Sequence, residues 1–314
     1  MKRALLVGID HYAGFSDLRG CENDVNALAP LLARNDDGSP AFDCQTKTGD
    51  VRRDQVLSDI DALLAGGADV GLLYFAGHGV GRDDDVVLVT HDGTDQTPGV
   101  AMSEILAKIS ASPVGEVIVM LDCCFSGAAG GVPQLGTPDA ALRGGLAILT
   151  ASRGDQTAAE TEEARGAFST FLCGALEGGA ADVMGKVTVA GIYSYLDESF
   201  GAWHQRPLFK ANLERLHELR STQPAVPLPE LRLLTGLFPE PKFEFALDPS
   251  YEPEAEPKHE DHEKAFATLQ KYRAAKLLEP IGEDHMYFAA MNSTGCRLTP
   301  LGEHYRHLVA EGYV

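Results

Sequence analysis

The alternation of short apolar runs with helical patterns is the feature that most constrains this chain. Four runs are brief, apolar and closed by Gly, Asp or Ser, which is typical of buried strands: 3–8, 70–75, 116–122 and 146–151. Other segments carry apolar residues three and four positions apart, as helices that pack on a sheet do: 22–34, 53–65, 103–110, 167–178 and 189–200. We also expect an extended piece at 206–212 and a small hairpin arm at 85–90. The alternation predicts an α/β domain with a mostly parallel sheet flanked by helices.

The composition changes after residue 220, where proline and acidic residues become frequent. Eight prolines between 221 and 257 disfavour regular structure, although 231–238 and 243–247 carry apolar side chains that can pack. Beyond them we expect a helix over 261–278, a hairpin of 285–291 with 295–298, and a helix over 300–311. We therefore predict an α/β domain over 1–220, a partly docked connecting segment over 221–257, and a small winged-helix-like α+β module over 258–314.

Charge and cysteine content limit the classes of partner and the cellular location. The chain has 46 acidic and 26 basic residues, a net charge of −20, so it should repel nucleic acid and favour cationic peptides. It has no long apolar run and no signal-peptide pattern at MKRALLVGIDHY, so we expect no membrane partner and a cytoplasmic location. Its six cysteines show no CxxC spacing, which predicts free thiols.

Two reactive side chains follow neighbouring strands of the predicted sheet. His78 lies in LLYFAGHGV and Cys124 in VIVMLDCCFSG, and the carboxyl ends of parallel strands meet at one edge. An imidazole beside a thiol stabilises the thiolate that attacks a carbonyl, so we predict Cys124 as nucleophile and His78 as base. The backbone N–H groups of Gly79 and Cys124 are predicted to face the oxyanion. The alternative is a buried cysteine that acts as a small apolar residue and a histidine that belongs to a turn.

Six segments together resemble the caspase-like peptidases of clan CD, nearest to metacaspases and bacterial caspase homologues. They are ALLVGIDHY, LRGCENDV, YFAGHG, LDCCFSG, TASRGDQTAAE and GAFSTFLCGAL, and the resemblance covers about residues 1–215. It implies a caspase-like fold and cysteine endopeptidase activity. The D-x-C-H-S-G motif of metacaspases favours Cys124 over Cys123 as nucleophile. This chain departs from the family at Phe125 and Ala76, where metacaspases have His and Ser.

The resemblance also assigns the substrate pocket. In metacaspases two aspartates form an acidic S1 pocket, and they match Asp24 and Asp122 here, which implies cleavage after Arg or Lys. A pair of carboxylates can give a guanidinium charge-assisted, bidentate hydrogen bonds. The alternative is that Asp24 caps the helix over 22–34 and Asp122 bonds to local amides.

Calcium is an open question because many metacaspases need it. This chain has an acidic cluster at Asp83, Asp84, Asp85, Asp92 and Asp95, but the cluster lacks the ligand spacing of an EF-hand. Charged loop tips are usually solvated. We predict no cofactor and no metal, with calcium as the alternative.

The C-terminal module resembles C-terminal regions of bacterial caspase-family proteins, and LTPLGEHYRHLV resembles the last helix of winged-helix domains. Its mixed charge argues against DNA. We expect a site for a nucleotide-like signal or a sensor protein, lined by Tyr272, His285, Tyr287, Asn292, Arg297 and Tyr305. The alternative is that these residues form the module's own core and surface.

The resemblance implies an effector of bacterial antiphage defence. Such a protease is activated by a signal, cleaves proteins with exposed Arg or Lys, and kills or arrests the infected cell. The alternative is a catalytically idle scaffold that binds partner proteins. The presence of both His78 and Cys124 counts against that alternative, because inactive relatives generally lose one of the pair.

Overall fold

The chain folds into two compact units. The computed structural model describes residues 1–82, 85–123, 125–126, 143–151, 166–200 and 207–314. Unit 1 comprises residues 1–181 and 186–222, and unit 2 comprises residues 182–185 and 223–314. The short piece 182–185 therefore leaves unit 1 in mid-sequence and joins unit 2.

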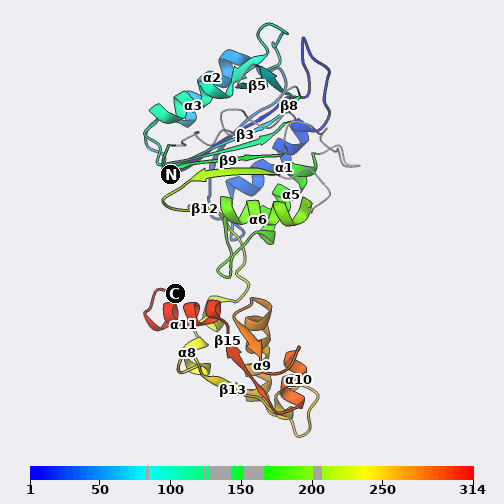
Figure 1. The fold of residues 1–314 in the computed structure, drawn as a ribbon, viewed down its shortest axis with the longest axis vertical. Helices are drawn as coiled ribbons and strands as arrows, with labels where there is room; N and C mark the ends of the chain where they lie inside the picture. Colours follow the sequence, from blue (N-terminus) through cyan, green and yellow to red (C-terminus); the bar gives the residue numbers. More distant parts are fainter. Residues whose placement is uncertain (83–84, 124, 127–142, 152–165, 201–206) are drawn as a thin grey trace. The chain divides into compact units, whose positions relative to one another are not determined.

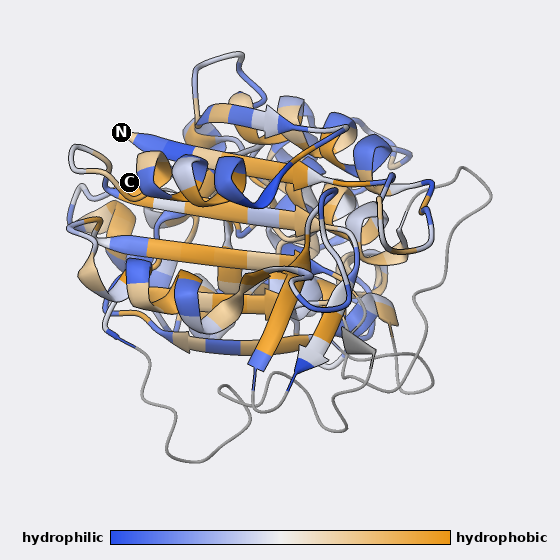
Figure 2. Cartoon of the chain, turned by 90° about the horizontal axis from the view of Figure 1, so that it is seen from above, coloured by the Kyte–Doolittle hydropathy of each residue, from blue (hydrophilic) through white to orange (hydrophobic). Residues whose placement is uncertain are grey.

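A six-stranded sheet forms the centre of unit 1 (Figure 1). Its strands, from one edge to the other, are β11 (Leu208–Asn212), β9 (Leu146–Thr150), β7 (Glu116–Asp122), β3 (Val70–Ala76), β1 (Lys2–Gly8) and β2 (Asp43–Lys47). All neighbours are parallel except β11, which runs antiparallel to β9. All four strands expected from apolar runs are present, and they are the interior strands. Figure 2 shows these strands as mostly apolar ribbons.

Helices cover both faces of this sheet (Figure 1). On one face lie α2 (Arg53–Leu63) and α3 (Met102–Ala111), and on the other lie α1 (Cys21–Ala33), α5 (Ala167–Gly174) and α6 (Val189–Phe200). Side chains alternate along each strand, so in β1 Leu5 and Val7 join the first core while Ala4 and Leu6 join the second. The prediction of an α/β domain with a mostly parallel sheet flanked by helices is confirmed.

Three short elements of unit 1 lie on the same side of the sheet as α5 and α6. The π-helix η1 (Ala175–Gly179) continues α5, and β10 (Lys186–Thr188) pairs with β12 (Glu218–Ser221). In the described part of the chain, no helix combines the length and apolar composition needed to cross a bilayer.

A second, smaller sheet follows the carboxyl ends of β3 and β7. Its order is β6 (Gly99–Ala101), β5 (Asp85–Val89), β4 (Gly79–Arg82) and β8 (Phe125–Ser126). β4 and β5 are antiparallel, which confirms the hairpin arm expected at 85–90. β4 and β8 are parallel, and they extend the pairing of β3 with β7 beyond the main sheet.

Unit 2 is an α+β unit with its own core. Its elements are α7 (Leu228–Leu231), α8 (Leu234–Leu237), β13 (Glu244–Ala246), η2 (Pro249–Tyr251), α9 (Glu260–Ala274), β14 (Leu278–Pro280), α10 (Met286–Met291), β15 (Gly295–Leu298) and α11 (Pro300–Ala310). The strands form one antiparallel sheet in the order β13, β15, β14.

The segment 221–257, expected to connect two domains, belongs to this core from residue 223 onward. Val226, Leu231, Leu234 and Phe238 are fully buried in the cluster that also holds the apolar side chains of α9. Proline interrupts the helices and strands of the segment, but the burial of the segment's apolar side chains still places it in the core. The boundary expected between residues 257 and 258 does not separate two units in the structure, because both sides belong to unit 2.

The hairpin expected from 285–291 and 295–298 is also wrong. Residues Met286–Met291 form helix α10, and β15 pairs instead with β13 and β14. The buried positions are Met286, Ala289 and Ala290, which are spaced as one face of a helix and not as one face of a strand.

Candidate active site

His78 lies just beyond the carboxyl end of β3, and Tyr12 holds its backbone. The His78 N–H donates to the Tyr12 hydroxyl at 3.0 Å, and that hydroxyl donates to the Ile9 carbonyl at 2.8 Å. The Tyr12 ring also lies beside the imidazole, with 4.8 Å between ring centroids. Gly77 leaves room for this contact, because a Cβ there would lie 2.6 Å from the Tyr12 hydroxyl oxygen. Tyr12 is buried, and burial raises the pKa of its hydroxyl, which keeps it a neutral donor.

The imidazole of His78 is oriented by a backbone carbonyl. Its Nε2 lies 2.8 Å from the Ser16 carbonyl oxygen, which can only accept a hydrogen bond. Nε2 must therefore carry the proton. In the neutral ring Nδ1 then has the free lone pair, and this is the atom that can take a proton from a thiol.

The loop that supplies the Ser16 carbonyl is held by an exposed ion pair. The Asp17 carboxylate accepts from the Tyr12 N–H at 3.1 Å and lies 3.2 Å from His11 Nδ1. The hydrogen bond that His11 donates to Asp17 raises the pKa of His11, and the hydrogen bond from the Tyr12 N–H lowers the pKa of Asp17. The same short loop therefore fixes both the backbone and the ring of His78.

Cys124 lies outside the described residues, but both of its chain neighbours are described. Cys123 is 3% exposed and packs in the core beneath the sheet. Phe125 pairs with Gly79, so the residue after Cys124 is opposite the residue after His78. Gly79 also pairs with Leu88 on its other side. The roles of Cys124 as nucleophile and of the Gly79 and Cys124 backbones at the oxyanion remain predictions.

Asp24 and Asp122 come from different elements and meet at one point. Asp24 belongs to α1 and Asp122 ends β7, and a Cβ at Gly166 would lie 3.2 Å from Asp24 Oδ2 and 2.8 Å from Asp122 Oδ2. The Gly166 N–H donates to Asp24, and the Ser169 hydroxyl donates to Asp122. Gly166 caps the N-terminus of α5, so the two carboxylates lie at the positive end of that helix.

Burial sets the protonation of Asp122. It raises the pKa of this carboxyl to about 6, although hydrogen bonds from Ser169 and Tyr74 act in the opposite direction. Tyr74 is fully buried, and its hydroxyl lies 2.5 Å from Ser169 Oγ, so a chain of hydrogen bonds leads from the sheet to the carboxylate. Burial and the nearby carboxylates of Asp10, Asp122 and Asp24 also raise the pKa of the Cys21 thiol.

The alternative that Asp24 caps its own helix is wrong. The start of α1 is capped by Asp10, whose carboxylate accepts from the Cys21 N–H at 2.9 Å and the Glu22 N–H at 3.4 Å. Asp24 lies one turn further along and accepts from Gly166 instead. The Asp122 carboxylate is likewise bonded to α5, more than 40 residues away in sequence.

Two members of the acidic cluster considered for calcium have structural partners. Asp85 accepts from the Ser103 N–H at 3.2 Å, near the start of α3, and Asp92 accepts from the Arg53 N–H at 3.0 Å, at the start of α2. Asp83 and Asp84 lie outside the described residues. Among the residues that are described, no three His, Cys, Asp or Glu side chains are arranged to hold a metal ion.

The six residues expected to line a sensing site are not all brought together. Tyr272 and Tyr305 are buried in the core of unit 2, and the Tyr272 hydroxyl donates to the Glu230 carbonyl. Arg297 on β15 pairs with Glu279. The other three residues lie on or beside α10: His285, Tyr287 and Asn292.

Sequence reasoning missed the residues that hold His78, Asp24 and Asp122 in place. Tyr12, Ser16, Gly166 and Ser169 received no role. Tyr12 does lie in the quoted segment ALLVGIDHY, and Gly166 and Ser169 lie in GAFSTFLCGAL. Their partners are distant in sequence, however, so nothing in the local pattern shows which group each of them supports.

The comparisons with known proteins identify the family of the chain. Residues 1–215 match the family model of the caspase domain, peptidase C14. Metacaspase-1 of Yarrowia lipolytica is 28% identical over 217 residues, covering 60% of this chain and 43% of the relative. Metacaspase-1 of Mycosarcoma maydis is 24% identical over 216 residues, covering 60% of this chain and 53% of the relative. The chain thus spans about half the length of these curated relatives. It belongs to the caspase-domain family of cysteine peptidases.

Proposed function

We propose that this chain is a cysteine endopeptidase that cleaves after Arg or Lys. Cys124 is the nucleophile, His78 the base, and Asp24 with Asp122 the acidic S1 pocket. The observation that carries the proposal is the convergence of the two carboxylates at Gly166. Asp122 lies close to the predicted base in the sheet, since it pairs with Ala76 across β7 and β3, two residues before His78.

The geometry of His78 supports the role of base. Nδ1 takes the thiol proton of Cys124 as the sulfur attacks the carbonyl carbon of the scissile bond. The oxyanion accepts hydrogen bonds from the Gly79 and Cys124 N–H groups. The imidazolium then gives its proton to the leaving amine, and an acyl-enzyme forms. Water, deprotonated by the same nitrogen, attacks the thioester and releases the acid and the thiol.

The two carboxylates support a cationic P1 side chain. A guanidinium donates from several N–H groups in one plane and can reach oxygens of both residues. Its positive charge also offsets the repulsion between two carboxylates held close together. An aspartate at P1 would add a third negative charge, so substrates of the animal-caspase type are disfavoured.

We further propose that unit 2 receives the signal that controls this activity, in an effector of bacterial antiphage defence. Unit 2 has its own core and lies almost wholly outside the matched caspase domain. The activator would be a nucleotide-like molecule or a sensor protein. The substrates would be proteins with exposed Arg or Lys.

Fluorogenic peptides that end in Arg, Lys or Asp test the enzymatic proposal. The full chain should release fluorophore from the Arg and Lys peptides, and Cys124→Ala should not. Asp122→Asn should lower kcat/KM for the Arg peptide at least tenfold, because one charge-assisted hydrogen bond is lost. Asp197→Asn, an exposed acid on α6, is the matched control and should leave it unchanged.

Two outcomes would contradict the proposal. Equal cleavage by the wild-type and Cys124→Ala proteins would exclude Cys124 as the nucleophile. Preferential cleavage after Asp would exclude the acidic pocket. To test the signal requirement, the same assay is run in lysate from phage-infected cells, where activity should rise over uninfected lysate.

A further inference from the structure

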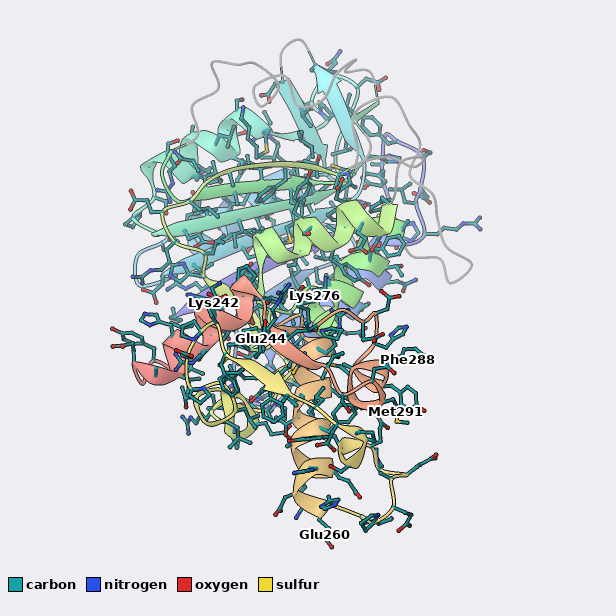
Figure 3. All side chains as sticks on the ribbon, turned by 60° about the horizontal axis from the view of Figure 1, so that its bottom comes forward. Lys242, Glu244, Glu260, Lys276, Phe288 and Met291 are labelled. Carbon is teal, nitrogen blue, oxygen red and sulfur yellow. The ribbon has the colours of Figure 1, made fainter. Side chains whose placement is uncertain are left out.

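Helix α10 of unit 2 exposes three large apolar side chains next to one another. Tyr287, Phe288 and Met291 are 51%, 46% and 44% exposed, although they lie within five residues. The Tyr287 and Phe288 rings contact edge to face with centroids 5.4 Å apart. Phe288 and Met291 both project outward from α10 in Figure 3. The three side chains therefore form one patch, here called the α10 patch.

The α10 patch does not serve the core of unit 2. The opposite face of α10 carries Met286, Ala289 and Ala290, which are all buried, and this face attaches the helix to the unit. Taking about 200 Å² for each large side chain, the patch leaves roughly 300 Å² of mostly apolar surface in water. Single exposed apolar residues are ordinary, whereas a contiguous patch of this size is often functional.

Acidic side chains lie at the edge of the patch. Glu283 accepts from the Asn292 amide at 2.7 Å, so its carboxylate lies beside the residue that follows Met291. Asp284 directly precedes the helix cap and is exposed. Among the described residues neither carboxylate forms an ion pair, and Arg297 of the same unit pairs with Glu279. The patch is thus apolar in the middle and negative at its margin.

This combination identifies the partner by its charge. A second copy of the chain would place the same carboxylates opposite one another, and its net charge of −20 would add to the repulsion. An anionic lipid surface would be repelled in the same way. A segment with apolar side chains flanked by Lys or Arg satisfies both parts of the surface.

We propose that the α10 patch is a docking surface for a cationic, amphipathic helix of a partner protein. Apolar side chains of the partner cover Phe288 and Met291, and its Lys or Arg residues pair with Glu283 and Asp284. The proposal does not depend on the peptidase activity, because it concerns binding to unit 2.

The test uses two synthetic helical peptides of roughly 18 residues, about five turns. One has Leu on one face and Lys on the other, and its twin has Glu in place of Lys. Fluorescence anisotropy measures their Kd for the full chain. The Lys peptide should bind, and Phe288→Ala should weaken it about thirtyfold, as at a central contact of an interface. Glu283→Gln together with Asp284→Asn should weaken it about tenfold and flatten its salt dependence.

Leu233→Ala is the matched control, because Leu233 is 50% exposed in unit 2 but does not belong to α10. It should leave the Kd unchanged. Equal loss from Phe288→Ala and Leu233→Ala, or equal affinity for the two peptides, would overturn the proposal. Two further results would also overturn it: a dimer in sedimentation that Phe288→Ala dissociates, or binding to vesicles of anionic lipid that Phe288→Ala abolishes. Thermal denaturation confirms that each variant is folded.

Discussion

The affinity for arginine should fall as the pH drops through the pKa of Asp122. Burial raises this pKa to about 6, so the carboxyl is charged above that pH and neutral below it. With a pKa of about 6, roughly nine tenths of the groups are charged at pH 7 and about one tenth at pH 5. If the charged form binds the guanidinium, the affinity should decrease about tenfold over this range.

Ser169 offers a way to move that midpoint without touching the carboxylate. Its hydroxyl donates to Asp122 and holds the pKa down, so Ser169→Ala should raise it. A hydrogen bond to a charged group contributes about 1.5–3 kcal/mol, and one pKa unit corresponds to 1.36 kcal/mol. The midpoint should therefore move up by about one to two pH units, to neutral pH or above.

Binding to the full-length Cys124→Ala protein is the assay, because it avoids the separate titration of the catalytic base. The Kd of a peptide with P1 arginine is measured from pH 5 to pH 8. A peptide with norleucine in place of arginine is the control. It has no cation at P1, so any change in its affinity with pH does not come from the contact between the carboxylate and the guanidinium. An arginine affinity that does not change over this range would refute the reasoning, as would the same midpoint in Asp122→Asn.

Three further variants test other parts of the structure. Tyr12→Phe removes the hydroxyl that holds the base, so kcat should fall about tenfold with KM unchanged; a rise in KM alone would contradict a positioning role. Cys123→Ala should keep most of the peptidase activity and lower the free energy of unfolding by about 1 kcal/mol, whereas Cys124→Ala abolishes activity; equal loss in both would reverse the assignment. Gly302→Ala would place a Cβ 1.8 Å from the Leu277 carbonyl oxygen, so unit 2 should be destabilised by about 3 kcal/mol, and an unchanged melting temperature would show that this close approach can relax.

The interior of the fold could be predicted because burial leaves a strong pattern. β3, β7 and β9 are almost wholly apolar, and the alternation of such runs with helical patterns along the chain indicates a parallel sheet. β2 was missed because it is an edge strand of sequence DCQTK, with three of its five residues exposed. It is a strand because its backbone pairs with that of β1. The order of its side chains does not indicate this pairing.

Unit 2 shows where a local pattern misleads. The run HMYFAAM was interpreted as a strand because it is apolar and aromatic, but its exposed aromatic side chains do not report core packing. The proline-rich segment is expected to be a partly docked connector, and in the structure Phe238 is one of the most buried large side chains of the described chain. In both cases tertiary contacts outweighed the local preference.

The candidate site was only partly readable from the sequence. His78, Asp24 and Asp122 could be named in advance, because they lie in segments that resemble a known family. The residues that orient them are linked by contacts of long sequence separation, such as the hydrogen bond from Gly166 to Asp24. Such contacts depend on how α5 docks against α1 and β7, which sequence spacing alone does not determine.

The N-terminus of α5 also affects how inhibitors of this site should be judged. Its N–H and hydroxyl groups already donate hydrogen bonds to both carboxylates of the proposed S1 pocket. A guanidinium that enters must share these oxygens or replace those donors. Its measured affinity therefore reflects the free energy of replacing the donors of the helix by those of the ligand at the same two carboxylates. Weak binding of an arginine mimic therefore does not by itself indicate a poor fit, because the donors at the N-terminus of α5 compete with it for the carboxylates.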